Sequence, residues 1–251
     1  MEWRDEAIVL AVRRLGEGAA VASLLTRTHG RHPGLVRGGQ SKAYRGVLLP
    51  GNRVDARWRA RLADQLGGLR CELVGAHAAA AMDDPGRLAA LAAACALCEA
   101  ALPERQPHEA VFEALLALLD ALAAESWPSV YVHWELALLR ALGYGLDLSA
   151  CAATGVPAPP PAAAEGVGRA NDELAYVSPR TGRAVSLSAG APYRDRLLAL
   201  PRFLVAGGEG DAAEIRAGLA LTGHFLDRHV LGPHAIPMPP ARSRLVDRFR
   251  G

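Results

Sequence analysis

The residues best suited to chemistry in this sequence form a dense run of basic side chains. Nine basic residues lie between Arg27 and Arg61, and Asp55 is the only acidic residue among them. A run of one sign at this density indicates either a polyanionic partner or a solvated face that only keeps the chain soluble. We interpret seven of the nine as phosphate contacts for nucleic acid: Arg27, Arg31, Arg37, Lys42, Arg45, Arg57 and Arg59.

Two aromatic residues in the same run could add base stacking, because grooves for single-stranded nucleic acid combine basic side chains with rings. These residues are Tyr44 and Trp58. The strand that contains Trp58 alternates in polarity, and Trp58 falls on its apolar face. We therefore expect Trp58 in the core, and Tyr44 is the better candidate for stacking.

The net charge of +2 conceals three regions of different sign. Residues 1–75 hold 13 basic and 7 acidic residues, residues 76–150 hold 3 and 10, and residues 151–251 hold 12 and 9. A polyanion is therefore expected to meet the N-terminal region first.

Other reactive residues do not assemble into a site. Cys95 and Cys98 have CxxC spacing, but they are in register with apolar leucines of a helix, so we expect both to be buried. Neither Cys151 nor the histidines supply the four ligands of a structural zinc site. The sequence has no GxSxG, GxxxxGK[ST] or HExxH motif. We predict no catalytic residue, no metal and no cofactor.

The basic run needs a scaffold, and the first 75 residues predict short strands with a loop at His29–Gly34. In Arg53–Leu62, alternation places the apolar residues, Leu62 included, on one face and arginines on the other. Five strands in about 75 residues are typical of a small barrel such as the OB-fold. The expected strands are Ala7–Arg13, Ala20–Thr26, Leu35–Arg37, Arg53–Leu62 and Gly68–Ala76.

After residue 78 the apolar period becomes helical. Asp83 and Asp84 precede a helix with Pro85 in its first turn, and further helices start at Pro107, Pro128 and Asp211. The Pro128 helix is expected to turn Val130, Trp134, Ala137/Leu138 and Leu142 inward, and the Asp211 helix Ile215, Leu219, Thr222, Leu226 and Val230. Residues 156–168 read as a low-complexity loop, and Leu174–Val177 with Arg183–Ser186 read as a hairpin. The predicted fold class is α+β, with an OB-fold barrel at 1–78 and an all-helical domain at 79–251.

Several of these segments, taken in order, resemble RecO proteins, and alphaproteobacterial members most closely. The likeness covers nearly the whole chain. It rests on Glu2–Leu10, Leu15–Glu17, Leu24–Thr26, Gly30, Gly38, Leu49–Gly51, Glu135–Leu148, Tyr176–Ser186 and Ile236–Leu245.

The resemblance implies a non-enzymatic recombination mediator of the RecF pathway. Such proteins bind single-stranded DNA, anneal complementary strands, and act with RecR to load RecA onto strands coated by single-strand-binding protein (SSB), whose acidic C-terminal tail they contact. A bacterial cytoplasmic, nucleoid-associated location would follow, and the absence of disulfide spacing among the four cysteines agrees with it.

Two departures from the family pattern matter. Many relatives carry a four-cysteine zinc ribbon, whereas here Cys151 stands with Thr154, Ser186 and Ala189, which implies a degenerate, metal-free ribbon near 149–191. Relatives also often place arginine before the Phe/Trp-Glu-Leu step, where this chain has Val132-His133. The candidates for a pocket that receives the SSB tail are His133, Trp134 and Arg140, although core packing explains Trp134 equally well.

Two other classes of function remain open at this point. An OB-fold protein directed at structured RNA would prefer stem-loops to single-stranded DNA. A metal-dependent hydrolase would contain bound metal and show nuclease activity.

Overall fold

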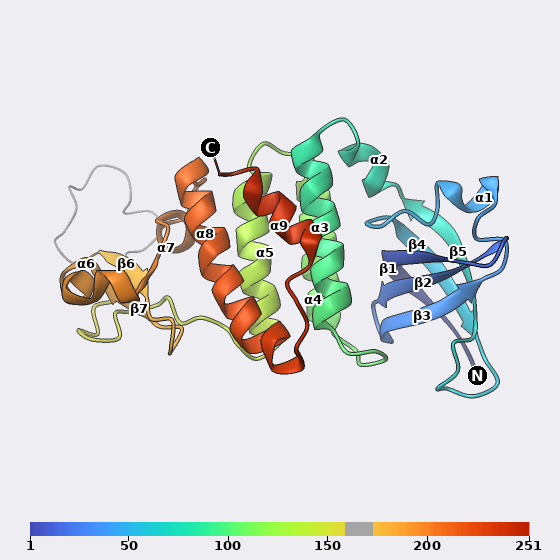
Figure 1. Ribbon diagram of the computed structural model, residues 1–251, viewed down its shortest axis with the longest axis horizontal. Helices are drawn as coiled ribbons and strands as arrows, with labels where there is room; N and C mark the ends of the chain where they lie inside the picture. The colour runs from blue at the N-terminus through green and yellow to red at the C-terminus, as the bar shows by residue number, and fades with distance from the viewer. Residues whose placement is uncertain (159–172, 251) are drawn as a thin grey trace. The chain divides into compact units, whose positions relative to one another are not determined.

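The computed structural model describes residues 1–158 and 173–250. The chain divides into two compact units, Met1–Ala124 with Met238–Leu245 and Glu125–Pro237 with Val246–Gly251. Strands form the N-terminal part of the first unit and helices most of the remainder, so the predicted α+β class is confirmed (Figure 1). The predicted loop at 156–168 falls mainly on residues outside those described.

A closed barrel opens the first unit, and the expected number of strands in this region is confirmed. The strand order is β1-β2-β3-β5-β4, with antiparallel pairs except for β3 and β5, which are parallel. This is an OB-like arrangement. The strands are β1 (Glu2–Leu15), β2 (Ala19–Thr26), β3 (Gly30–Val36), β4 (Arg53–Arg59) and β5 (Gly68–Gly75).

Strand β1 closes the barrel because it serves two neighbours. Its first half pairs with β4 from Glu2 to Ile8, and its second half pairs with β2 as far as Leu15. The register shifts between Val9 and Ala11, and such a bulge bends a strand and increases its twist. The bend carries β1 from one neighbour to the other.

Two predictions for these strands are wrong. His29–Gly34 is not a loop, because β3 begins at Gly30. The Leu35 N–H donates to Gly67 O and therefore points away from β2. Backbone groups alternate along a strand, so the nitrogen of Pro33, two residues earlier, points to the same side. On that side β3 pairs with β5 only at Leu35. A proline is tolerated there because no ladder hydrogen bond is required of it. Strand β4 also ends at Arg59, which leaves Leu62 54% exposed rather than inward.

The barrel interior is filled by small and branched apolar side chains, with Trp58 among them as expected. The indole of Trp58 is 2% exposed, and its Nε1 donates to Leu66 O at 2.9 Å. The loop after β4 closes over this ring at Gly67, whose φ is 66°. A Cβ at Gly67 would lie 2.4 Å from Trp58 Nε1, so only glycine fits.

Three further helices belong to the first unit: α2 (His77–Ala81), α3 (Pro85–Ala101) and α4 (Glu109–Ala121). Asp84 caps α3, its side chain accepting from the N–H groups of Gly86 and Arg87, as the sequence predicts. Helix α3 lies on the barrel, where the Cys95 thiol contacts Val9 O at 3.7 Å. Cys95 and Cys98 are 1% and 0% exposed, so the expectation of buried cysteines is confirmed. Burial raises the pKa of Cys95 to about 12.

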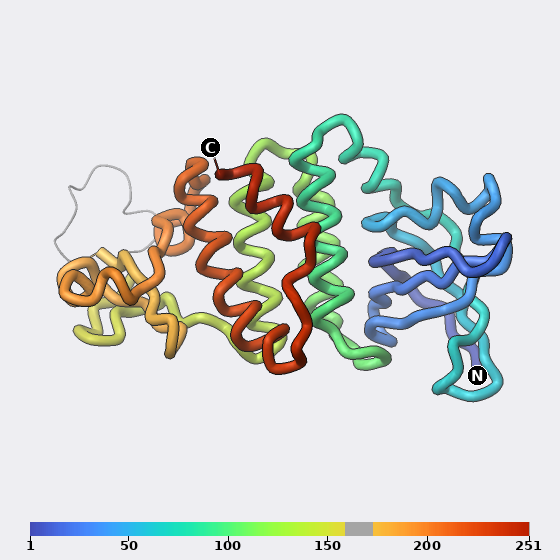
Figure 2. Tube along the Cα trace, viewed as in Figure 1, coloured from blue at the N-terminus to red at the C-terminus, as the bar shows by residue number. Residues whose placement is uncertain are grey.

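In the second unit, α5 (Trp127–Ala141) and α8 (Ala212–Phe225) run side by side (Figure 2). Asp211 caps α8 in a capping box with Glu214. The apolar stripe predicted from Ile215 to Val230 is buried, but its last turn is the π-helical segment η3 (Leu226–Leu231). The stripe predicted for α5 is confirmed in part: Trp134 and Leu138 are buried, whereas Val130 and Leu142 are half-buried and Ala137 is exposed.

A small sheet in the second unit contains β6 (Leu174–Val177), β7 (Ala184–Ser186) and β8 (Leu198–Ala199) in the order β7-β6-β8. The predicted hairpin is confirmed as β6 and β7, whereas β8 was not anticipated. Short turns α6 (Leu187–Gly190) and η2 (Ala191–Arg196) connect β7 to β8. The remaining helices are α1 (Lys42–Arg45), α7 (Phe203–Ala206), η4 (Gly232–His234) and α9 (Pro240–Asp247). No helix of the described residues has the length and apolar character needed to cross a membrane.

Candidate nucleic-acid interface

The predicted phosphate contacts fall into groups with different surroundings, and the first group faces the helices of its own unit. Arg27 pairs with Glu6 at 2.8 Å and with Glu113 of α4, and its guanidinium lies 4.5 Å from the centre of the Phe112 ring. This side chain is 31% exposed. Acidic and aromatic groups of the same unit therefore already engage its charge.

Arg31 is held more tightly. Its Nε donates to Leu102 O at 2.7 Å, and its Nη1 lies 3.3 Å from Glu99 and 3.4 Å from Glu104. The side chain is only 16% exposed. Ion pairs with this degree of burial resist screening better than exposed pairs. Arg31 thus joins β3 to the end of α3.

A second group lies in the connection between β3 and β4. Arg37, Lys42 and Arg45 are exposed, and within the described residues none of them forms an ion pair. The amide of Gln40 donates to Gly16 O at 2.9 Å and to Ala19 O at 2.7 Å. These bonds tie the connection to the turn between β1 and β2.

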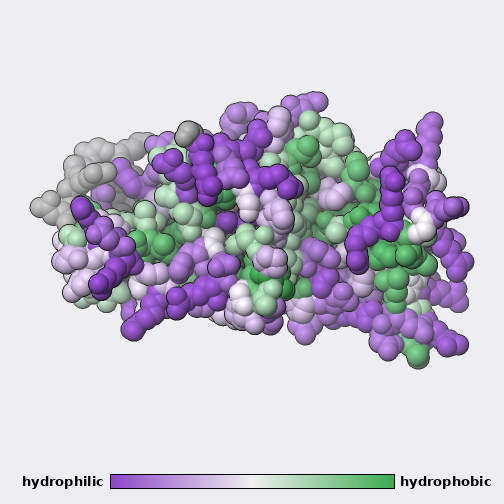
Figure 3. Space-filling view, in the orientation of Figure 1, coloured by the Kyte–Doolittle hydropathy of each residue, from purple (hydrophilic) through white to green (hydrophobic). Residues whose placement is uncertain are grey.

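The tie brings two arginines that the sequence reasoning missed to the same end of the barrel. Arg13 and Arg14 precede the β1–β2 turn, and both are exposed. Across the β1–β2 and β2–β3 ladders, Arg14 pairs with Ala20 and Ala20 with Val36, next to Arg37. We call Arg13, Arg14, Arg37, Lys42 and Arg45 the loop patch. Hydrophilic residues gather over the α1 end of the barrel in Figure 3.

Only the topology reveals this grouping, because more than 20 residues separate Arg14 from Arg37 in the sequence. An OB-like strand order places the β1–β2 turn beside the end of β3. A prediction of the OB-like fold could therefore have placed Arg13 and Arg14 beside Arg37, whereas a count of charges along the sequence could not.

Arg57 and Arg59 form a third group on the outer face of β4. Both are exposed, and Arg59 lies 4.0 Å from Glu2. In the ladders, Arg57 is opposite Arg4 on β1 and Arg70 on β5. The next row carries Glu6, Asp55 and Glu72. Acidic and basic rows thus alternate, which weakens the field of this face.

One contact on this face is well defined. Arg4 Nη2 lies 2.6 Å from Asp55. The hydrogen bond from Arg4 lowers the pKa of Asp55, so this carboxylate stays ionised and neutralises Arg4. The loop patch is therefore the stronger site for an anion.

The two candidate stacking rings have different positions. Tyr44 is half-buried and packs against the barrel core, and Trp58 is inside that core. The barrel also has an aromatic stack that the sequence reasoning did not identify, in which Trp3 lies between His29 at 4.6 Å and Trp58 at 5.8 Å, centre to centre.

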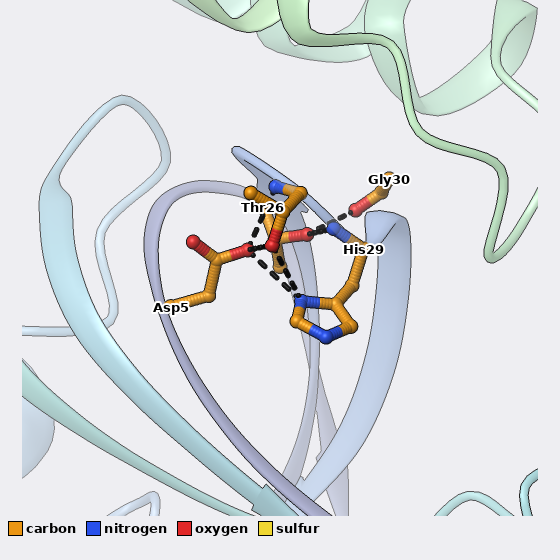
Figure 4. A network of polar contacts seen from close by, with 5 residues as sticks. Asp5, Thr26, His29 and Gly30 are labelled. Atoms are coloured by element: carbon orange, nitrogen blue, oxygen red, sulfur yellow. Dashed lines mark hydrogen bonds and ion pairs between the residues drawn. The ribbon is translucent and has the colours of Figure 1, made fainter.

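A polar network orders the β2–β3 turn beside this stack (Figure 4). The carboxylate of Asp5 accepts from the Thr28 N–H and hydroxyl and contacts His29 Nδ1 at 3.0 Å. Burial raises the pKa of Asp5, but these hydrogen bonds outweigh burial and lower it. Gly30 follows with φ 69°, and a Cβ there would lie 1.9 Å from Gln106 O. The turn is thus built to approach the chain that follows α3.

Two of the three candidates for the SSB tail line a pocket in the second unit. His133 and Arg140 line this pocket of about 390 Å³, together with four leucines and with Asp147, whose carboxylate lies 3.5 Å from Arg183: the leucines are Leu136, Leu146, Leu148 and Leu204. Trp134 does not line it, since it is 3% exposed and packs on Tyr131 at 5.5 Å between ring centres. Burial lowers the pKa of His133, which leaves Arg140 as the cation of the pocket at neutral pH.

Three of the four residues at the expected ribbon positions interact: Cys151, Thr154 and Ser186. The Ser186 N–H donates to Cys151 Sγ at 3.3 Å, and the Ser186 hydroxyl lies 3.5 Å from the same sulfur. Burial raises the pKa of Cys151, but hydrogen bonds from Ser186 and Thr154 outweigh it and lower the pKa to about 6. Among the described residues, no group of three or more His, Cys, Asp or Glu side chains could hold a metal.

A closed five-stranded barrel with an exposed basic end, followed by a helical region, is an arrangement typical of proteins that bind nucleic acid. Family models for the N-terminal and C-terminal regions of recombination protein O match residues 1–77 and 82–235. The chain belongs to the RecO family of DNA repair proteins, which are non-catalytic recombination mediators of the RecF pathway.

Named relatives agree with this assignment. The chain is 61% identical over 250 residues to the DNA repair protein RecO of Rhodospirillum centenum, covering 100% of this chain and 95% of the relative. It is 49% identical to that of Rhodospirillum rubrum, covering 100% and 97%. It is 51% identical to that of Phenylobacterium zucineum, covering 99% and 98%.

Proposed function

We propose that the barrel is an OB-fold that binds single-stranded DNA through the loop patch. The observation that supports this is the contrast within the basic run: the helices engage Arg27 and Arg31, whereas Arg37, Lys42 and Arg45 are exposed and form no ion pair among the described residues. Free guanidinium and ammonium groups bind phosphates with release of counterions. Arg57 and Arg59 extend the contact more weakly.

In this proposal the chain anneals complementary strands at the bacterial nucleoid. With RecR, it helps to load RecA onto strands coated by SSB. The structure-specific RNA alternative predicts tighter binding of a stem-loop than of single-stranded DNA, and a direct competition between the two ligands separates these functions.

The test is a salt titration of oligonucleotide affinity. A triple variant, Arg37→Ala, Lys42→Ala and Arg45→Ala, should bind every sequence more weakly. The slope of log K against log salt should fall by about 0.7 for each lost phosphate contact, or roughly two in all. The matched control is Arg216→Ala, Arg228→Ala and Arg248→Ala, which removes three exposed arginines of the second unit. An unchanged slope in a folded loop-patch variant assigns the patch to solubility alone.

The acidic tail of SSB is proposed to enter the pocket lined by His133 and Arg140. An apolar anchor would contact the leucines of the pocket, while Arg140 receives a carboxylate. Trp134 then supports the helix from the core and does not touch the tail.

The test of this pocket is a titration with a fluorescent tail peptide. Arg140→Glu should weaken binding on the order of tenfold, or ~1.4 kcal/mol, while DNA affinity is retained. Arg216→Glu on α8 is the matched control, because Arg216 is exposed and does not line the pocket. Equal affinities would move the tail site elsewhere, with Arg194, Arg196 and Arg202 as the next candidates.

The ribbon is proposed to be degenerate and metal-free. Its support is the contact between Cys151 and Ser186, in which a hydroxyl and an N–H stand where relatives are expected to place metal ligands. Elemental analysis should find well under one zinc per chain, and a chelator should leave the melting temperature unaltered. Stoichiometric zinc would contradict this.

A further inference from the structure

A second pocket, of about 310 Å³, lies in the second unit beside the small sheet. Residues of three segments line it, among them Ala152, Thr181, Val185 and Leu197. Tyr193 of η2 completes the lining, and this residue is 60% exposed. No other tyrosine among the described residues is as exposed.

The exposure of Tyr193 is not explained by packing. In the described part of the chain its ring stacks on no other aromatic residue, and its hydroxyl takes part in no hydrogen bond. Large aromatic side chains usually bury most of their surface. A free ring face beside a shallow apolar floor is suited to a planar ligand.

Arginines that neighbour the lining residues in the sequence favour an anionic ligand. Arg180 lies in the turn between Ser178 and Thr181, which both line the pocket, and Arg194 directly follows Tyr193. Arg196 is the last residue of η2, the turn that contains Tyr193 and Arg194. Arg194 contacts Asp195 at 3.6 Å, but that carboxylate is 92% exposed, so the pairing is weak.

We propose that this pocket is a second contact for single-stranded DNA, in which a nucleobase stacks on Tyr193 and Arg180, Arg194 and Arg196 hold the flanking phosphates. Stacking accepts any base because every base has an aromatic face, as annealing of arbitrary sequences requires. The inference rests on the proposed function of the barrel and deepens it. Two contacts in one chain allow two complementary strands to be held at once.

An acidic peptide is the less favoured occupant. A peptide anchor needs a deep apolar slot, whereas alanines make up much of this lining: Ala152, Ala153 and Ala189. The leucine-rich pocket of His133 and Arg140 suits a peptide better.

The direct test is photocrosslinking of the full-length chain to an oligonucleotide that contains 5-iodo-2′-deoxyuridine. Tryptic digestion should yield the peptide Ala184–Arg194 with a nucleotide adduct on Tyr193. The adduct should persist in the triple loop-patch variant, whose overall affinity is reduced. If the barrel proposal alone fails, that variant keeps full affinity and still forms the adduct, so the two failures are distinguishable.

A second measurement separates stacking from mere proximity. In the loop-patch background, Tyr193→Leu should lower oligonucleotide affinity on the order of tenfold, as expected for loss of one stacked base, and slow annealing, while Tyr193→Phe should retain both. Tyr144→Leu is the matched control, since Tyr144 is 43% exposed and lines neither pocket.

Because Tyr193 is exposed, these variants should keep the wild-type melting temperature. Equal affinities for Tyr193→Leu and its parent, with no adduct on Tyr193, would overturn the proposal. Loss of tail-peptide binding in Tyr193→Leu with unchanged DNA affinity would assign the pocket to a peptide and would also overturn it.

Discussion

Arg31 and Arg37 are six residues apart on the same barrel, yet they have opposite environments. Arg31 is enclosed by Glu99, Glu104 and the carbonyl of Leu102, whereas Arg37 is exposed and forms no ion pair among the described residues. Glu99 and Glu104, which are part of the acidic excess of residues 76–150, are thus paired with an arginine of their own unit. The sequence shows how many charged residues a cluster contains. Only the fold shows which of them are free of ion pairs and can bind a ligand.

The largest expected effect of this difference is on stability. Arg31→Met keeps the apolar stem but removes the donor to Leu102 O and one of the two donors to Glu99, which keeps the Ser23 hydroxyl. It should lower the free energy of unfolding by about 2–3 kcal/mol. Arg37→Met, the matched control, should change it by less than about 0.5 kcal/mol. Urea denaturation measures both. Equal stabilities would show that the enclosure of Arg31 contributes nothing.

A smaller effect concerns the order of the loop patch. Gln40→Ala removes two hydrogen bonds that tie the β3–β4 connection to the β1–β2 turn. It removes no charge, so any loss of DNA affinity reports preorganisation. We expect a loss of roughly fivefold, about 1 kcal/mol, with an unchanged salt slope. Gln65→Ala, in the β4–β5 loop, is the control, and equal affinities for the two variants would show that the patch acts as independent charges.

The smallest expected effect is a difference in pKa between Cys151 and the other cysteines. Cys151 should ionise near pH 6, because hydrogen bonds to its sulfur outweigh burial, whereas burial raises the pKa of Cys71 and Cys95 to about 12. Since the folded pKa of Cys151 lies below its ordinary value, the stability that it contributes is present above about pH 9 and is lost as pH falls towards 6. Thiolate absorbance at 240 nm should therefore rise near pH 6 by one cysteine. The rise should vanish in Cys151→Ser, and a first ionisation above pH 8 would contradict the assignment.

Much of the fold could be predicted because local signals agreed with it. The alternation of Val54, Ala56 and Trp58 identified β4, and Asp84 and Asp211 marked helix starts. The single stripe predicted for α5 captures only part of its buried surface, because the buried residues, from Trp127 to Leu139, occupy more than one stripe. A helix buried on several sides has no single apolar face from which the phase can be read.

The site was harder to predict because it depends on contacts distant in the sequence. Arg27 looks like Arg37 until α4 supplies Glu113, and Arg13 looks isolated until Gln40 joins its turn to the next connection. His133 and Arg140, named as candidates from the family resemblance, line one pocket because positions seven apart lie on one face of a helix. Trp134 follows His133 directly and therefore points to another side of the helix, into the core.

The most direct test of the account is arginine modification by phenylglyoxal, with and without a saturating oligonucleotide, read by mass spectrometry. We predict that the loop-patch arginines Arg13, Arg14, Arg37 and Arg45 react in the free protein and are protected by DNA. Arg27 and Arg31 should react slowly in both states, because Glu113, Glu99 and Glu104 hold them. A loop patch that reacts equally with and without DNA, or protection by DNA confined to Arg27 and Arg31, would contradict it.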